Sequence, residues 1–313
     1  MPTYQDISRH TSNVLLPDEV SSEIWAKTLE ESAFMRLARK ITIPGTGVKV
    51  QTITGEPAAN WVDETNAKPV SFHSFGNKTI VPYKLAVIEP FSDEFRRDKA
   101  GLYGECVSRL PKALAKKFDS TIMSTSAPGS GFDVLGNCTK TSILASADPA
   151  LSVYDKFLSV YDAIANADAE MNGIALSPAG KSIVLGAKDG QGYPLFTSGV
   201  GTDAVGNILG ASTYFTKGVG VAGVASTGTG DAGTPAIVGV AGDFDDALWG
   251  SVEGIKMKIS DQATLTYTNQ SDQTVTINLW QQNMFAVMFE IEVAFAVKST
   301  SEFILLTGKT PTA

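Results

Sequence analysis

The sequence is poor in the side chains on which most hydrolytic and zinc-dependent enzymes rely. Its 313 residues include two histidines, His10 and His73, and two cysteines, Cys106 and Cys138. Neither histidine belongs to an HExxH motif, a nucleophile elbow or a Cys/His cluster, which excludes most zinc and nucleophilic hydrolase chemistry. Two cysteines make no disulfide framework. We interpret Cys106 as a small core residue on a helix, whereas Cys138, in a loop, indicates no function.

Long apolar runs and long basic runs are absent as well. No window is apolar and long enough to span a bilayer, and no basic start followed by an apolar run marks a signal peptide. We therefore expect a cytosolic protein in reducing surroundings, with no membrane partner. The net charge of −8 and the pI near 4.9 argue against a protein that grips nucleic acid by neutralising phosphates.

What is present is the composition of a folded protein. Hydrophobic residues make up 43% of the chain and charged residues 19%, which excludes wholesale disorder. The length is enough for one large domain or two ordinary ones, with a sizeable core.

A Gly-rich segment, residues 198–235, contains two GxGxxG matches, "GVGVAG" at 218–223 and "GTGDAG" at 228–233. A dinucleotide site needs a strand before this motif and a helix directly after it, and neither match has both. The composition is typical of loops that lie close to other backbone, or that stay mobile until something packs on them.

The segment "GDFDDALWG" groups Asp243, Asp245 and Asp246, a candidate site for a hard metal ion. Calcium or magnesium would need further oxygen ligands, and no EF-hand spacing follows. We interpret the segment as a polar turn between strands, and we expect neither a metal nor a cofactor.

Hydrophobic spacing gives a coarse order of elements. It predicts helices over about 22–39, 100–124 and 153–171, strands over about 47–62 and 71–88, and a run of strands after 235. Pro111 is expected to kink or split the second helix. Ser152 and Asp155 form a near capping box for the third, whose apolar face we assign to Phe157, Leu158, Tyr161, Ile164 and Ala165.

The strands 47–62 and 71–88 flank "GEPAANWVDETNAKP", in which Trp61 stands among polar and acidic residues. At ~3.3 Å per residue each strand could reach about 50 Å, too long for a compact sheet, so this hairpin should project. Burying a tryptophan is worth several kcal/mol, at ~25 cal/mol per Å² of apolar area. Trp61 therefore packs either on another chain or at the hairpin base on its own domain.

The order of parts along the chain is specific. A polar arm and a short helix precede the hairpin with "WVDE", the exit "FGNKTIVPYKLAVIEPFSDEFRRD" and a long helix ending "KKFDSTIMS". Then come "IALSPAGKSIVLGAKDGQGYPLF", the Gly-rich loops, "VGVAGDFDDALWGSVEGIKMKIS" and "NLWQQNMFAVMFEIEVAFAV". This succession resembles the major capsid protein family of tailed bacteriophages, whose fold is named after phage Hong Kong 97, and the resemblance covers about residues 20–308.

The resemblance implies an α+β fold and a division of the chain into six parts. These are the N-terminal arm and short helix (1–43), the extended-loop hairpin (44–88), the peripheral domain with its spine helix (89–149), the axial domain with Gly-rich loops (150–235), the peripheral strands (236–298) and a C-terminal segment returning to the axial domain (299–313). Two features depart from the family pattern. The arm starts near Met1, so a scaffold is separate or unnecessary, and Pro111 interrupts the spine helix.

The resemblance also implies a function. The chain would be a structural protein rather than a conventional enzyme, assembling as pentamers and hexamers into an icosahedral virion capsid in the host cytoplasm. The shell would enclose double-stranded DNA without sequence-specific binding, alongside scaffold, portal and decoration proteins. Interface residues would be Trp61, Val62, Glu64 and Lys68, and Gly218, Gly220, Gly228 and Gly230 would lie in loops at the capsomer axis. The alternatives are an encapsulin-like nanocompartment and, remotely, a dinucleotide-dependent cytosolic enzyme.

Some members of that family form isopeptide crosslinks between subunits, and matching residues occur here. Lys68 precedes Pro69 at the hairpin tip, and Asn283 is followed seven positions later by Glu290. A lysine amine would attack the asparagine side chain while a glutamate acts as base. Asn283 and Glu290 would face opposite sides of a regular strand, so a bulge or a base from another subunit is required.

Overall fold

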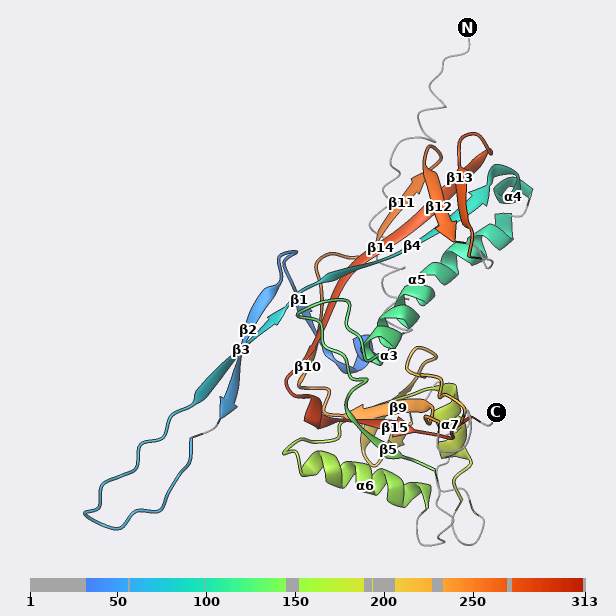
Figure 1. Cartoon of the computed structure of the whole chain (residues 1–313). Helices are drawn as coiled ribbons and strands as arrows, with labels where there is room; N and C mark the ends of the chain where they lie inside the picture. The colour runs from blue at the N-terminus through green and yellow to red at the C-terminus, as the bar shows by residue number, and fades with distance from the viewer. Residues whose placement is uncertain are drawn as a thin grey trace.

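The computed structural model describes residues 32–55, 57–98, 100–144, 152–188, 193, 206–226, 233–268 and 272–311. Two regions of sheet and helix lie one above the other, and a long hairpin projects to one side of them (Figure 1). The helices are α3 (Ala33–Leu37), α4 (Asp93–Asp98), α5 (Ala100–Ile122), α6 (Val153–Ala165), α7 (Pro178–Leu185) and the 3-10 helix η1 (Thr300–Glu302).

The first region, here called the long-sheet region, is a five-stranded sheet with α5 along one face. Its strands are β1 (Arg39–Thr42), β4 (Tyr83–Ser92), β10 (Ala247–Ser251), β11 (Lys256–Ser260) and β14 (Met284–Val297). β14 is antiparallel to β4, β10 and β11, while β1 joins β10 in parallel. Phe285, Val287, Phe289, Ile291 and Val293 are buried in the core that α5 shares.

α5 has the 3.6-residue periodicity of an amphipathic helix. Leu110, Leu114, Phe118 and Ile122 are buried against the sheet at four-residue spacing. Pro111 lies inside this helix, which continues through it as one element, so the predicted split does not occur. The proline is itself buried, and its packing against the core compensates for the backbone hydrogen bond that it removes.

The second region, here called the six-stranded region, has the strand order β5-β15-β9-β6-β8-β7. Its strands are β5 (Thr139–Ser142), β6 (Gly173–Leu176), β7 (Asn207–Ile208), β8 (Ala211–Phe215), β9 (Ile237–Gly242) and β15 (Phe303–Thr307). Every residue of β6, β9 and β15 is buried. α6 and α7 contribute to the core on one face, whereas Ala175, Val240 and Leu305 point into the core shared with α5.

Strand pairing differs from the expected segment boundaries at three places. β5 lies within 89–149 and β9 within 236–298, yet both pair with β15 in the six-stranded sheet. β1, within the expected arm segment 1–43, joins the long sheet through β10. The chain therefore crosses between the two regions more often than the sequence indicated.

The expected helices are present with changed limits. Of the helix expected over 22–39, the described part is α3; residues 1–31 lie outside the described residues. The capping box of α6 is confirmed, since Ser152 and Asp155 bond reciprocally, but α6 ends at Ala165 rather than near 171. The apolar face predicted for α6 is only partly correct. The buried stripe is Val153, Phe157, Val160 and Ile164, whereas Leu158, Tyr161 and Ala165 are exposed.

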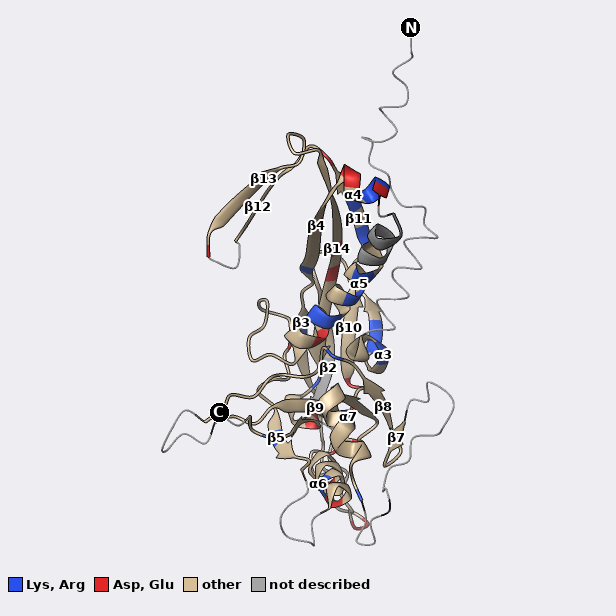
Figure 2. Ribbon diagram, turned by 90° about the vertical axis from the view of Figure 1, so that its right-hand side faces the viewer, with Lys and Arg blue, Asp and Glu red and all other residues tan. Residues whose placement is uncertain are grey.

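Two pairs of strands stand apart from these sheets. β2 (Val48–Gly55) and β3 (Ser74–Ile80) form the projecting hairpin, and β12 (Thr264–Thr268) and β13 (Thr274–Asn278) form a second one. Figure 2 shows β12 and β13 extending away from β4 and β14 on the side opposite α5.

Candidate assembly surfaces

The projecting hairpin is shorter in its ladder than the sequence predicted. β2 and β3 pair antiparallel from Val48 opposite Ile80 to Gly55 opposite Ser74, and residues 57–73, here called the tip, contain no strand. The strand predicted over 71–88 is divided at Val81 and Pro82, after which β4 joins the long sheet. Pro82 has no N–H for a ladder and Val81 donates its own to Gly131 O at 3.0 Å, so the ladder stops here.

Apolar and charged contacts fix the base of the hairpin to the long sheet. Ile80 is buried with Ile43, Ala294 and Ala296. Lys78 forms an ion pair of 2.5 Å with Asp133 and donates a hydrogen bond to the carbonyl oxygen of Val297. The same Asp133 carboxylate accepts from the Val297 N–H at 2.8 Å. The direction in which the hairpin leaves the body is therefore set by its own chain.

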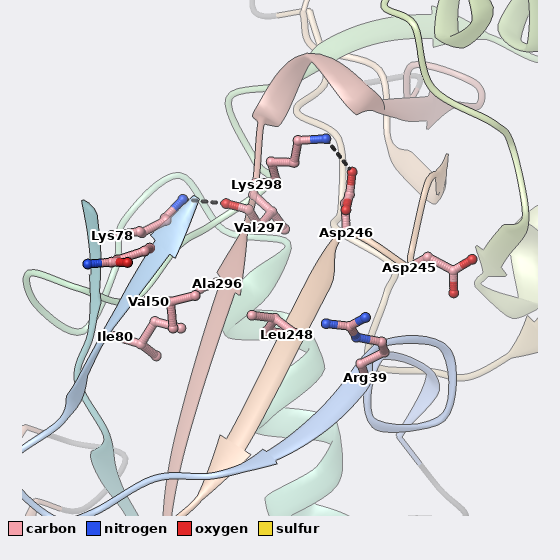
Figure 3. Close-up of a pocket in the computed structure, with 11 residues that line it drawn as sticks. Arg39, Val50, Lys78, Ile80, Asp245, Asp246, Leu248, Ala296, Val297 and Lys298 are labelled. Carbon is pink, nitrogen blue, oxygen red and sulfur yellow. Dashed lines mark hydrogen bonds and ion pairs between the residues drawn. The ribbon is translucent and has the colours of Figure 1, made fainter. Parts of the chain in front are cut away.

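A pocket of about 180 Å³ lies between this base and the sheet (Figure 3). Its lining includes Arg39, Lys78, Asp245, Asp246 and Lys298, and Lys298 Nζ lies 2.9 Å from Asp246 Oδ2. Both lysines of the lining are thus ion-paired, Lys298 with Asp246 and Lys78 with Asp133. We assign the pocket to the joint between hairpin and body.

The acidic turn has structural partners. Asp243 accepts from Asn172 Nδ2 at 2.7 Å and from the Asp245 N–H at 3.1 Å, while Asp246 pairs with Lys298. Among the described residues, no group of three or more His, Cys, Asp or Glu side chains is placed to hold a metal ion. These contacts fit the polar-turn interpretation.

The tip carries three strongly exposed apolar side chains, and the adjoining end of β3 carries a fourth. Trp61 is 105% exposed, Phe72 82% and Val70 76%, and Phe75 in β3 is 70% exposed. The alternative in which Trp61 packs at the hairpin base on its own domain is therefore wrong. Val62 is half-buried, and Glu64 and Lys68 are exposed beside it.

Sequence reasoning identified Trp61 but missed Val70, Phe72 and Phe75, which share its exposure. The signal was available in "VSFHSF", where apolar residues alternate with polar ones in a segment that has no core of its own. The tip holds its shape locally, because the Ala58 N–H donates to Ser71 Oγ at 2.8 Å across its two sides. It therefore presents an apolar surface that no described residue of the same chain covers.

The proposed axial glycines are described in part. Gly218 is buried against α5, where a Cβ atom would lie 2.6 Å from that of Asp119. Gly220 is exposed and lies beside Ser177. Both glycines lie close to other parts of the chain, as expected if the Gly-rich segment forms loops packed against neighbouring segments. Gly228 and Gly230 lie outside the described residues.

The candidate crosslinking residues do not meet within one described chain. The Asn283 side chain donates to Glu94 Oε1 at 2.7 Å. Glu290 lies further along β14, where Lys84 Nζ is 3.4 Å away, and Lys68 is at the exposed tip. A hydrogen bond from its own backbone, and then the one from Asn283, lower the pKa of Glu94. Within the subunit, the carboxylate that contacts the Asn283 side chain is therefore Glu94 and not Glu290. The sequence did not indicate this contact.

Comparison with solved structures defines the class of fold. The chain resembles chains from Mycobacterium phage Bobi (TM-score 0.68, 19% identity, 90% of this chain and 91% of that one) and Gordonia phage Cozz (TM-score 0.65, 19% identity, 90% and 87%). It also resembles the capsid of a native GTA particle (TM-score 0.56, 14% identity, 88% and 89%). The fold is the α+β capsid fold named after phage Hong Kong 97, as expected from the sequence.

The family follows from sequence. The model of the phage capsid family matches residues 12–308, so the chain belongs to that family. A relative named probable major capsid protein gp17, from Mycobacterium phage L5, is 32% identical over 94% of this chain and 89% of its own length. The major capsid protein of Staphylococcus phage 80alpha is 22% identical over 93% and 84%. In the described part of this chain, no helix is long and apolar enough to cross a bilayer.

Proposed function

We propose that this chain is the major capsid protein of a tailed phage, and that its copies assemble as pentamers and hexamers into an icosahedral shell. One observation carries the proposal. The tip exposes Trp61, Val70 and Phe72 on an arm whose base is fixed to the body, so the apolar surface is presented outward. Large apolar groups held in water on a rigid arm favour burial against a partner surface. The partner in this proposal is a neighbouring copy of the same chain.

The remaining parts take the following roles in this proposal. The long-sheet region with α5 is the peripheral domain, and the six-stranded region is the axial domain, with the exposed Gly220 in a loop that faces the capsomer axis. Trp61, Val62, Glu64 and Lys68 contact the neighbouring subunit. Assembly takes place in the host cytoplasm, with portal protein and separate scaffold or decoration proteins as further partners.

The shell encloses double-stranded DNA without reading its sequence. Support comes from the net charge of −8, because a predominantly acidic wall attracts phosphate weakly and lets the genome leave. An encapsulin-like compartment shares the fold but would enclose a cargo enzyme. The family match and the phage relatives favour the capsid over this alternative.

Electron microscopy of the purified protein tests the proposal. We expect closed shells that contain both pentamers and hexamers. Small shells without hexamers that copurify with an enzyme would favour the compartment instead. A protein that stays monomeric at every concentration and salt condition would refute the proposal.

Crosslinking by Lys68, Asn283 and Glu290 is a further proposal, and because Lys68 lies on the projecting hairpin while Asn283 precedes β14, it would join different subunits. The Lys68 amine, after losing a proton to a carboxylate, would attack the Asn283 side-chain carbon, forming an amide bond and releasing ammonia. Its support is the exposed Asn283 amide held at a carboxylate. Denaturing electrophoresis of mature shells should show multiples of 33.0 kDa that vanish in Lys68→Ala. A single monomer band from wild-type shells would end the proposal.

A further inference from the structure

A buried acid connects the two regions of the subunit. Asp119 lies near the end of α5 and is 0% exposed. Ser32 Oγ lies 2.5 Å from its Oδ1, and the Ala33 N–H donates to its Oδ2 at 3.1 Å. The Phe34 N–H and the Thr216 side chain also form hydrogen bonds to this carboxyl group. One side chain of α5 thus holds both the start of α3 and the loop that follows β8.

The loop after β8 is fitted closely to Asp119. Gly218 is buried there, and a Cβ atom on it would lie 2.6 Å from the Asp119 Cβ and 3.0 Å from the Lys116 carbonyl oxygen. Only a glycine lets this loop, which belongs to the six-stranded region, reach the acid. The contact between the regions at this point therefore combines the hydrogen bonds of the carboxyl group with apolar packing, since Val219 of the same loop is buried in the core shared with α5.

No cation compensates the buried acid among the groups that face it in the described structure. The charged residue of α3 is Arg36, that of the loop 216–219 is Lys217, and those of α5 within one turn of Asp119 are Lys116 and Lys117; all four are exposed. Burial raises the pKa of Asp119 to about 7, and the hydrogen bonds from Ser32, Ala33, Phe34 and Thr216 act in the opposite direction. A buried carboxylate without a cation is costly even when it is hydrogen-bonded.

We propose that the Asp119 junction is a pH-responsive latch that holds α3 and the loop 216–219 to α5 most tightly at acidic pH and loosens progressively as the pH rises towards neutrality. In the neutral acid, the proton is shared with Ser32 Oγ, and a hydroxyl group can donate or accept, so this contact persists. In the ionised form, the carboxylate gains most from water, which it reaches only if the loop or α3 moves away. This inference concerns the single subunit and does not depend on shell formation.

The direction of the effect follows from linkage. The pKa of Asp119 in the folded chain, about 7, lies above the ordinary value of 3.8, so the folded subunit binds this proton more tightly than the unfolded chain. The stabilisation is therefore complete below the unfolded pKa, and between the two pKa values each pH unit should weaken latch closure by up to about tenfold. Above the folded pKa the acid is ionised in both states, so closure should no longer depend on pH.

Hydrogen exchange of the full-length unassembled subunit between pH 4 and 9, corrected for intrinsic rates, tests the latch. In wild-type protein the protection of amides in α3 and in 216–219 should fall from about pH 4 to about pH 7 and stay level above it, while α6 stays protected. Asp119→Asn should remove this pH dependence, whereas the matched control Asp162→Asn, on the exposed face of α6, should retain it. An unchanged pH dependence in Asp119→Asn would overturn the proposal.

A second variant covers the case in which Asp119→Asn does not fold. Thr216→Val removes one donor to the carboxylate and keeps the acid, so it disfavours the charged form. The pH above which protection stops falling should therefore move upward in Thr216→Val. If that pH moves downward, or stays unchanged, the assignment of the transition to Asp119 is contradicted.

Discussion

The tip and the six-stranded sheet differ in the exposure of their apolar side chains. Every residue of β6, β9 and β15 is buried, with Phe303 edge-on to Phe244 at 5.4 Å between ring centroids. The tip instead holds Trp61 and Phe72 almost wholly in water. Burial of apolar area is the main source of stability, so the sheet is stabilised by its own chain. The apolar surface of the tip contributes to stability only when a second chain covers it.

Removing the tip should give the largest difference between the two regions. A variant in which a short Gly-Ser turn joins Gly55 to Ser74 lacks Trp61, Val70 and Phe72 but keeps Phe75. We expect it to form no stable shells, because the arm can no longer reach a neighbour. Its free energy of unfolding as a subunit should change by less than about 0.5 kcal/mol, the range typical of exposed positions.

Light scattering and chemical denaturation measure these two quantities. As a control, the same number of residues can be replaced by a flexible polar sequence of equal length, which separates contact from reach. An unfolded or aggregated subunit after removal of the tip would place the tip in the core and abolish the contrast.

Two tryptophans allow the tip and the body to be compared with the same type of side chain. Trp249 is 1% exposed in β10, so Trp249→Ala should destabilise the unassembled subunit by about 3–5 kcal/mol. Trp61→Ala should leave subunit stability within about 0.5 kcal/mol and lower the denaturant concentration at which shells dissociate. Equal losses of subunit stability in the two variants would show that Trp61 is buried by its own chain.

The smallest effect on subunit stability is expected at the base of the hairpin, where it joins the body. Lys78→Met removes the ion pair to Asp133. The Lys78 side chain is 32% exposed and the Asp133 side chain 25%, so the loss should destabilise the subunit by about 1 kcal/mol or less. Most of that loss should disappear at high salt. Lys49→Met, at an exposed position of the paired strand β2, is the matched control. Urea denaturation at low and high salt measures the stability loss in each variant. If Lys49→Met destabilises the subunit as much as Lys78→Met, the ion pair at the hairpin base is not a specific stabilising contact.

The amino-acid sequence by itself determined the local elements. Four-residue spacing of Leu110, Leu114 and Phe118 predicts α5, and Ser152 with Asp155 predicts the start of α6, because helix periodicity and capping depend on neighbours in the chain. The isolation of Trp61 in a polar segment likewise predicts a projecting arm. The order of these parts was sufficient to indicate the fold that the solved structures share.

Only the tertiary structure decided which strands pair and what surrounds each polar group. β5, β9 and β15 come from three distant segments. β9 and β15 are buried throughout and would fit any interior sheet equally well, whereas β5, "TKTS", is polar and mostly exposed, so no apolar pattern marks it as a strand of this sheet. Asp119 stands in the helix as an ordinary acid. Its character comes from Ser32, Ala33 and Thr216, which lie about a hundred positions away in either direction and meet only at the junction of the two regions. Burial and long-range hydrogen bonding are properties of the folded chain, so no local pattern encodes them.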